Sequence, residues 1–198
     1  FRSLQTSVIS HRGPPSPSWS TVSVFSIISD VQANEKGFRT FLLQFYNGFS
    51  AHADCGAVFL YDKKRRSIGL AHAGWKGTLK RVGTELVRSM QTAFGTKAED
   101  LIAATGPCIC FDCFEVGAEI GRQFAEEFHS DELVKPGKTG KAYVDIRAAI
   151  EKQLEECGVL PQNIYAMPLC TFERSDLFYS YRRDRTKTGA MVSVLKLI

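Results

Sequence analysis

Two side chains suited to metal binding or nucleophilic chemistry lie at the far ends of two apolar segments. Cys55 begins the segment 55–61, His72 lies near the end of the segment 67–73, and polar residues separate the two segments. Both segments are typical of buried strands and together predict a hairpin. With the turn centred at 63–64, the antiparallel register places Cys55 directly opposite His72.

Three kinds of role fit this pair. Directly opposed residues hold their Cβ atoms about 4.5–5.5 Å apart, which suits a thiolate at about 2.3 Å and an imidazole at about 2.0–2.1 Å from one zinc ion. Without metal, the imidazole could lower the pKa of the thiol and activate it as a nucleophile. A structural role is also open, with Cys55 as a small buried apolar residue and His72 as a hydrogen-bonded core residue.

The segment that follows His72 could hold an anion. Residues 74–77 (Gly-Trp-Lys-Gly) lead from the second strand into a predicted helix. Free backbone N–H groups and the positive end of that helix would lie beside His72, ready for phosphate or a carboxylate. Lys76 and Gly77 are therefore candidate phosphate-binding residues. An ordinary strand-to-helix turn with Trp75 in the core explains the same residues equally well.

The spacing of apolar residues predicts further elements of both kinds. Helices are expected over 79–94 with Thr78 as N-cap, over 116–128, and over 145–157 with Ile146, Ile150 and Leu154 buried. Strands are expected at 101–105, 164–167 and 190–197. Because strands and helices alternate, the fold class is α/β or α+β, in one domain. Residues 1–50 are rich in Ser and Pro and keep neither period for long, so no element is assigned there.

The composition limits the class of protein. The 198 residues are 44% hydrophobic and carry a net charge of +4, and the basic run 63–66 is explained as a solvated turn. We therefore expect no nucleic-acid partner. No stretch has the roughly 18–20 apolar residues of a membrane span, and no secretory signal pattern opens the sequence. A soluble, cytoplasmic protein is expected, with no membrane partner.

The six cysteines are too sparse for a disulfide scaffold and are expected to be reduced thiols. Three of them crowd together, at Cys108, Cys110 and Cys113. This spacing can hold a metal ion elsewhere, but the sequence shows no second Cys/His cluster beside it. Buried thiols are therefore the preferred interpretation of the three.

Five short motifs follow one another between residues 53 and 198. They are Ala53-Asp54-Cys55, His72-Ala73-Gly74-Trp75-Lys76-Gly77, Gly106-Pro107-Cys108-Ile109, Phe114-Glu115-Val116-Gly117, and Tyr179-Ser180-Tyr181-Arg182-Arg183-Asp184 with Thr188-Gly189. In type and order they resemble the purine nucleoside phosphorylase family that was formerly classed with laccase-like polyphenol oxidases. The resemblance implies a four-layer α/β/β/α fold, with mixed sheets flanked by helices, over a family domain at 51–198.

The resemblance also implies a zinc ion held by the Cys of the first motif, the His of the second and one upstream His. Carried over, the metal ligands are Cys55 and His72, with copper as the alternative metal. The family carries its third ligand in a Gln-Val-His segment, which residues 1–50 lack. His11 and His52 are the upstream histidines, and neither matches that segment. A truncated, spliced or frame-disrupted N-terminal segment is our hypothesis for this departure.

For activity, the resemblance implies phosphorolysis of adenosine, inosine, guanosine and methylthioadenosine, with deamination of adenosine. The implied partners are purine nucleosides and phosphate, and a homodimer is left open. Phosphorolysis needs fixed cations around the phosphate while positive charge develops on the ribose. This assigns Arg183 to catalysis with Cys55 and His72, and Arg182 to the substrate beside Lys76. Either arginine could instead be a solvated residue or pair with Asp184.

Three alternatives from other classes stay open. A four-copper laccase conventionally needs about ten histidines, whereas this chain has four, so only a lower-occupancy copper site with polyphenol oxidase activity remains. A Cys-His hydrolase would use Cys55 and His72 without metal. A catalytically inactive interaction protein is the third alternative. Zinc with an open position would favour the nucleoside enzyme, because it lowers the pKa of bound water for deamination.

Overall fold

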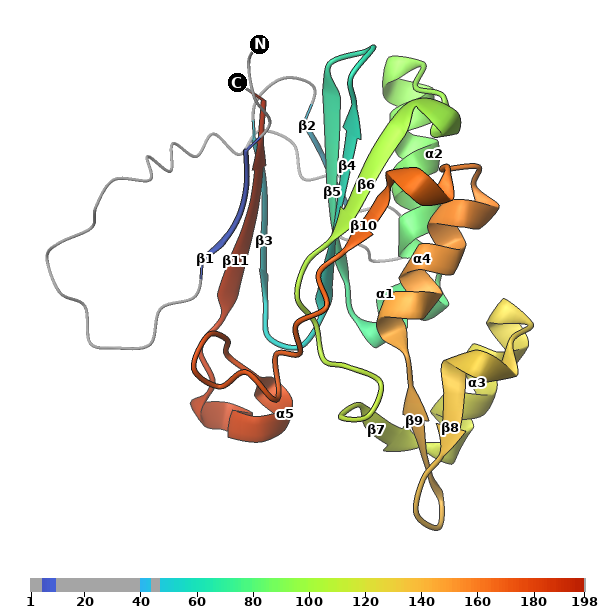
Figure 1. Ribbon diagram of the computed structural model, residues 1–198, viewed down its shortest axis with the longest axis vertical. Coiled ribbons are helices and arrows are strands. Elements are labelled where there is room, and N and C mark those ends of the chain that lie inside the picture. The colour runs from blue at the N-terminus through green and yellow to red at the C-terminus, as the bar shows by residue number, and fades with distance from the viewer. Residues whose placement is uncertain (1–4, 10–39, 44–46, 198) are drawn as a thin grey trace, which may run out of the picture.

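The computed structural model describes residues 5–9, 40–43 and 47–197, and there the chain is a mixed α/β protein with five α-helices and three sheets (Figure 1). The helices are α1 (Trp75–Leu79), α2 (Val82–Phe94), α3 (Ala118–Phe128), α4 (Ile146–Glu156) and α5 (Tyr181–Asp184). No helix in this described part is long and apolar enough to cross a membrane. The expected mixture of helices and strands is confirmed.

The central sheet has five strands in the order β10-β6-β4-β5-β2. They are β2 (Thr40–Leu43), β4 (Gly56–Asp62), β5 (Ser67–Ala73), β6 (Leu101–Thr105) and β10 (Ile164–Ala166). The predicted hairpin is present as β4 and β5, and the strands predicted at 101–105 and 164–167 are β6 and β10. Neighbouring strands are antiparallel, except for the parallel pair of β10 and β6.

Strand β4 is buried on both faces, which explains its continuous apolar run. Val58 and Leu60 belong to the large core that includes α2 and α4, whereas Ala57 and Phe59 belong to a smaller core with Leu195. Successive side chains of a strand point to opposite faces, so one strand serves both cores. Helices α1, α2 and α4 cover one face of the central sheet and a second sheet covers the other (Figure 1).

That second sheet has the order β1-β11-β3, all antiparallel. It consists of β1 (Gln5–Ile9), β3 (Asn47–His52) and β11 (Met191–Lys196), the last being the strand predicted at 190–197. Strand β1, with β2 and most of β3, falls within 1–50, where the apolar pattern identified no element. Three of the four expected layers are thus formed by the helices and the two sheets, and the outer helical layer stays an expectation.

The third sheet, β7-β9-β8, packs against α3. Its strands are β7 (Glu115–Gly117), β8 (Val134–Pro136) and β9 (Lys141–Val144), and none of them was predicted. The helix expected over 116–128 begins only at Ala118, because Val116 pairs with Ala142 in this sheet. The helix expected over 145–157 is confirmed as α4, which buries the three predicted apolar residues Ile146, Ile150 and Leu154.

The helix expected over 79–94 is wrong at its start, because the chain forms two helices there. Helix α1 already begins at Trp75, and α2 follows after Arg81, whose φ of 62° is left-handed. A left-handed residue interrupts the helical hydrogen-bond ladder, so one continuous helix cannot form. Thr78 is not an N-cap, since its hydroxyl donates to the carbonyl of Gly74, 3.1 Å away within α1.

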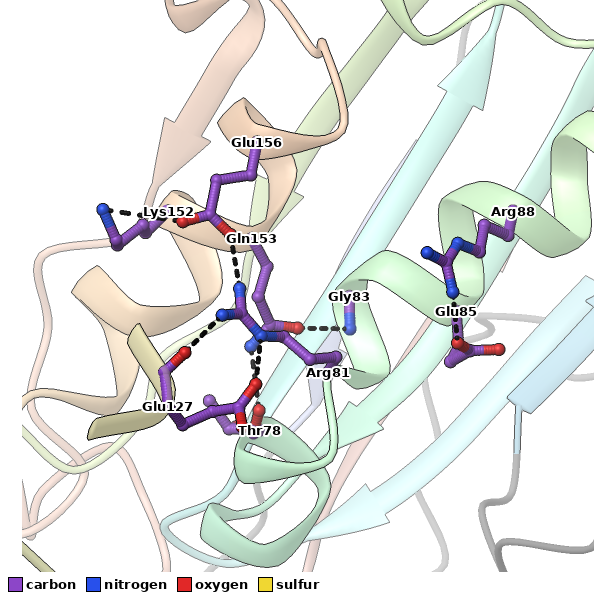
Figure 2. A network of polar contacts seen from close by, with 9 residues as sticks. All are labelled: Thr78, Arg81, Gly83, Glu85, Arg88, Glu127, Lys152, Gln153 and Glu156. Carbon is purple, nitrogen blue, oxygen red and sulfur yellow. Dashed lines mark hydrogen bonds and ion pairs between the residues drawn. The ribbon is translucent and has the colours of Figure 1, made fainter. Parts of the chain in front are cut away.

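Gln153 bridges the two helices at this break (Figure 2). Its side chain is fully buried, donates to the Thr78 carbonyl at 3.0 Å and accepts from the Gly83 N–H at 2.9 Å. The Gly83 N–H, at the start of α2, would otherwise lack a partner, whereas the Thr78 carbonyl also accepts from the Arg81 N–H at 3.0 Å and gains Gln153 as a second donor. Beside it, Arg81 forms ion pairs with Glu127 and Glu156. The start of α2 is thereby held against α3 and α4.

Replacing Gln153 by Ala should lower the free energy of unfolding by about 2–4 kcal/mol, because the change opens a cavity and leaves the buried Gly83 N–H without a partner. Chemical denaturation monitored by circular dichroism would measure it. Gln123→Ala, at an exposed position of α3, is the matched control and should change the value by less than about 0.5 kcal/mol. Equal effects of the two variants would contradict the bridging role.

Candidate functional site

Cys55 and His72 lie near one end of the central sheet, on the face turned toward the second sheet. The register differs from the prediction by two residues: His72 is opposite Ala57, and Cys55 precedes β4. The predicted turn was centred too early, because Asp62 still pairs with Ser67 in the ladder and the turn spans 63–66. A shift of two keeps the face of every side chain, so the pair is diagonal rather than directly opposed.

The two side chains nevertheless converge on one point, beside Gly74. A Cβ atom placed on Gly74 would lie 3.0 Å from Cys55 Sγ and 3.5 Å from His72 Nε2. A thiol and an imidazole therefore border a volume that is open only because residue 74 has no side chain. Any larger residue would fill the space in which both could contact a shared ion or substrate.

His52 is a further residue that the fold brings here. It is buried at the end of β3, with 3% of its surface exposed, and its ring meets that of His72 edge-on at a centroid distance of 6.1 Å. His52 Nε2 lies 2.7 Å from Ser193 Oγ, whereas Nδ1 is buried without a partner. The other upstream histidine, His11, lies outside the described residues. Sequence spacing could not favour His52, because its proximity to His72 depends on the packing of two sheets.

Burial changes the protonation of all three side chains. It lowers the pKa of His52 to about 4, assisted by repulsion from His72, and also lowers the pKa of His72. It raises the pKa of Cys55 to about 11, assisted by the charge of Asp54. Near neutral pH the imidazoles are therefore uncharged and Cys55 is a thiol. Neutral imidazole is the form that binds metal, while the thiol must first lose its proton.

Asp54 joins this site to two distant segments. It is buried, has a left-handed φ of 74°, and accepts from the Thr171 hydroxyl at 2.7 Å and from the Arg182 backbone N–H at 2.6 Å. Its own carbonyl accepts from Ile109 N–H at 3.0 Å. The left-handed turn re-aims the chain just before Cys55, and the carboxylate fixes the residues that flank it. Asp54 is thus a positioning residue that the sequence analysis did not single out.

The two predicted arginines have different surroundings. They lie in the short helix α5, which Ser180 caps by accepting from the Arg183 N–H at 3.1 Å. All five guanidinium donors of Arg183 are engaged, with both oxygens of Asp184 and with the carbonyls of residues 171, 172 and 178. The Arg182 guanidinium donates to the carbonyl of Glu115 at 2.6 Å and stacks near Phe114. Its Nε and Nη2 atoms form no hydrogen bond with the described residues.

The predicted phosphate-binding residues lie in α1 rather than in a loop before it. Gly77 is in the first turn of α1, where backbone N–H groups have no helical partner. Lys76 is exposed, with its Nζ 5.4 Å from the Trp75 ring centroid. Trp75 is partly buried and packs against the large core, as the alternative interpretation expected. Both features are present, so the tryptophan does not exclude an anion at Lys76.

A second cluster of ligand-type side chains lies outside this site. Cys110, Cys113, Cys170 and Glu173 each offer one atom within 4.8 Å of the others, the only group of three or more such residues in the described chain. Of the crowded cysteines only Cys108 is fully buried, so the buried-thiol interpretation is wrong for the other two. All six cysteines are free. Sequence spacing does not reveal the cluster, because its second pair lies far along the chain from the first.

Residues 49–198 match the family described as multi-copper polyphenol oxidoreductase laccase. The purine nucleoside phosphorylase YlmD of Bacillus subtilis (strain 168) is 35% identical over 145 residues, which cover 72% of this chain and 52% of that protein. Adenosine deaminase RL5, from an unknown prokaryotic organism, is 37% identical over 144 residues, covering 69% of this chain and 55% of that protein.

The fold is similar to that of a solved relative as well. The crystal structure of YlmD from Geobacillus stearothermophilus matches with a TM-score of 0.76 and 27% identity, over 81% of this chain and 61% of that one. The chain spans about half the length of the curated relatives it matches. The family match extends over most of the described residues and includes both Cys55 and His72. This chain belongs to the laccase-domain family, whose members include proteins named purine nucleoside phosphorylase.

Proposed function

We propose that this chain carries the site of a zinc-dependent purine nucleoside phosphorylase that also deaminates adenosine. The observation that carries the proposal is the convergence of Cys55 Sγ and His72 Nε2 beside Gly74, with the ring of His52 against that of His72. Relatives at 35–37% identity are named for these two activities. The substrates we propose are adenosine, inosine, guanosine and methylthioadenosine, with phosphate as the second reactant.

The donor set at Gly74 fits zinc. Catalytic zinc sites use three protein ligands, commonly Cys and His, and keep one position open. Cys55 and His72 supply two, and the unpartnered buried Nδ1 of His52 makes this residue our candidate for the third. The three do not form a compact ligand group as they stand, so the ring of His52 must move closer to Cys55 Sγ and His72 Nε2 to join them. A bound zinc ion would supply a water of low pKa for deamination.

The chain's own residues would do the work of phosphorolysis. A phosphate oxygen bonds to C1′ while the glycosidic bond breaks, the electrons of that bond pass to the purine, and the purine takes up the proton that the attacking phosphate loses. Lys76 and the spare donors of Arg182 would hold the phosphate charge as positive charge develops on the ribose. Arg183 has no spare donor, so we assign it the positioning of the segment that contains Thr171, in place of direct contact.

Cys55→Ser and His72→Ala should each reduce kcat/KM for phosphorolysis and deamination by at least about a hundredfold, and lower bound zinc by one equivalent. Released base and ribose 1-phosphate would be followed with adenosine or inosine, with and without phosphate. Cys157→Ser, at a half-buried thiol outside both clusters, is the control and should behave as the parent. Full activity in either site variant would refute the assignment. Parent protein with neither zinc nor turnover would favour the interaction-protein alternative.

Lys76→Gln should raise the KM for phosphate by about tenfold, with little change in the KM for inosine, because one charge contact to an anion is lost. Initial rates at varied phosphate would measure it. Lys63→Gln removes an equally exposed charge from the distant β4–β5 turn and is the matched control. A rise in the KM for inosine alone, or equal effects of both variants, would place the phosphate elsewhere.

The pKa of Cys55 separates the zinc enzyme from the Cys-His hydrolase. In metal-free protein the thiol should react slowly with iodoacetamide at pH 7, and its rate should rise about tenfold per pH unit until the pKa near 11, because only the thiolate attacks. Mass spectrometry of the peptide that contains Cys55 would give the rate. Rapid alkylation at pH 7, with a plateau below pH 8, would show an activated nucleophile and favour the hydrolase.

Copper-dependent polyphenol oxidation is the second candidate, because the matched family bears that description. The structure offers one Cys/His group near Gly74, and the whole chain has only four histidines, too few for a four-copper mechanism. Oxygen uptake with a phenol by copper-loaded protein, lost in His72→Ala, would favour this activity. No uptake with copper bound would leave the nucleoside reactions.

A further inference from the structure

The Cys110/Cys113/Cys170/Glu173 cluster is built from two turns of the same design. Cys110 and Cys113 are separated by two residues, and so are Cys170 and Glu173. In the first turn Cys113 N–H and Phe114 N–H donate to the Cys110 carbonyl at 3.1 and 3.0 Å. In the second turn Arg174 N–H donates to the Cys170 carbonyl at 3.0 Å. Each turn thus presents its first and fourth side chains on one side, as metal-binding Cys-x2-Cys turns do.

The distances suit a single tetrahedral ion. Glu173 Oε1 lies 3.8 Å from Cys110 Sγ and 3.6 Å from Cys113 Sγ. With zinc–sulfur bonds of about 2.3 Å and zinc–oxygen bonds of about 2.0–2.2 Å, tetrahedral angles require a sulfur-to-oxygen separation of about 3.6 Å. The four ligand atoms all lie within 4.8 Å of one another. Small side-chain adjustments would therefore place every atom at bonding distance from a common centre.

The surroundings support a metal more than a set of inert thiols. Cys170 is buried, Cys110 and Cys113 are half-buried, and Glu173 is exposed at the rim, so an ion has a route of entry. The Cys110 N–H points at Cys170 Sγ from 3.3 Å, the kind of backbone hydrogen bond that orients and stabilises a metal-bound thiolate. Three thiolates select thiophilic ions such as zinc over magnesium or calcium. Iron–sulfur clusters usually require four cysteines, which this group lacks.

We propose that Cys110, Cys113, Cys170 and Glu173 hold a structural zinc ion that is distinct from the metal proposed at Cys55 and His72. Four protein ligands leave no open position for substrate or water, which is typical of a structural site. The ion joins the segment after β6 to the segment after β10. Those segments already meet through an isolated parallel β-bridge between the backbones of residues 108 and 170, and through a hydrogen bond from Thr171 N–H to the Cys108 carbonyl.

The position of this ion gives it a role in the fold of the site. Thr171, next to Cys170, donates its hydroxyl to Asp54, the residue before Cys55. Ile109, next to Cys110, donates its backbone N–H to the Asp54 carbonyl. The zinc ion therefore fixes two of the three segments that hold Asp54 in place, and the third is that of Arg182. This inference does not depend on the proposed enzymatic activity.

The test uses the full chain with Cys55→Ser and His72→Ala combined, so that the proposed catalytic metal cannot contribute. After incubation with zinc and removal of free zinc by gel filtration, this protein should retain one equivalent of zinc, measured by inductively coupled plasma mass spectrometry. Adding Cys113→Ser should remove it, whereas adding Cys157→Ser should not. Cobalt in place of zinc should give the thiolate-to-metal absorption and the intense visible bands of a tetrahedral site. Circular dichroism would verify that each variant is folded.

Glu173 gives a variant that does not risk the fold, because its side chain is exposed. Glu173→Gln should weaken zinc binding by at least about tenfold in competition with a chromophoric chelator, and Glu173→Cys should restore it, since thiolate is an equally good ligand. Removing zinc with a chelator should lower the Tm of the Cys157→Ser control, which keeps all four ligands. It should leave the Tm of the Cys113→Ser protein unchanged, because that protein has no zinc to lose. The proposal would be overturned if the folded protein with Cys55→Ser and His72→Ala retained no zinc. It would also be overturned if adding Cys113→Ser left the zinc content unchanged.

Discussion

The carboxylate of Asp54 is the interaction on which the arrangement of the site depends. It is buried, and it is held by the Thr171 hydroxyl and the Arg182 backbone N–H, while its own carbonyl accepts from Ile109. A buried carboxylate is tolerated only when its oxygens have partners, so the segments of Thr171 and Arg182 must lie against Asp54 for its burial to be stable. Cys55 follows directly in the chain and inherits this fixed position. Removing one of these partners would leave an oxygen of Asp54 unpaired. The position of Cys55 would then change, although no contact of its thiol had been removed.

This dependence connects the two metal centres that we propose. The cluster around Cys170 fixes the two turns that supply donors to Asp54, and Asp54 in turn aims Cys55 toward Gly74. The proposed structural zinc site, with its four protein ligands, would therefore help to set the geometry of the proposed catalytic site. For that catalytic site the sequence motifs supply only two ligands. Support from a structural zinc ion suits a chain in which the candidate ligands His52 and His72 lie on β-strands of two different sheets. Rigid support is what keeps two such ligands at a fixed separation.

The sequence predicted the central part of the fold and only part of the site. Apolar period and polar turns located β4, β5, β6 and α4, because these elements are buried and their patterns are local. The short strands around β9 were missed, since three or four residues carry no readable period. The break at Arg81 was missed because Gln153, which gives the Gly83 N–H its acceptor, belongs to a helix far along the chain. Cys55 and His72 were identified, whereas His52, Asp54 and Glu173 acquire their roles only through contacts between remote segments.

The two-sided burial of β4 has a consequence for how this hairpin can vary. A slip of the β4–β5 pairing by one residue would send Phe59 into the helix-facing core and Leu60 into the space between the sheets, so neither core would fit its new contents. A slip by two residues preserves both faces and keeps Cys55 and His72 on the side of His52. Packing on both faces of β4 therefore opposes any shift of the β4–β5 register by an odd number of residues. The same packing keeps the side chains of the site on their present face. The packing that stabilises the interior of this protein thus also prevents Cys55 and His72 from turning toward the helices.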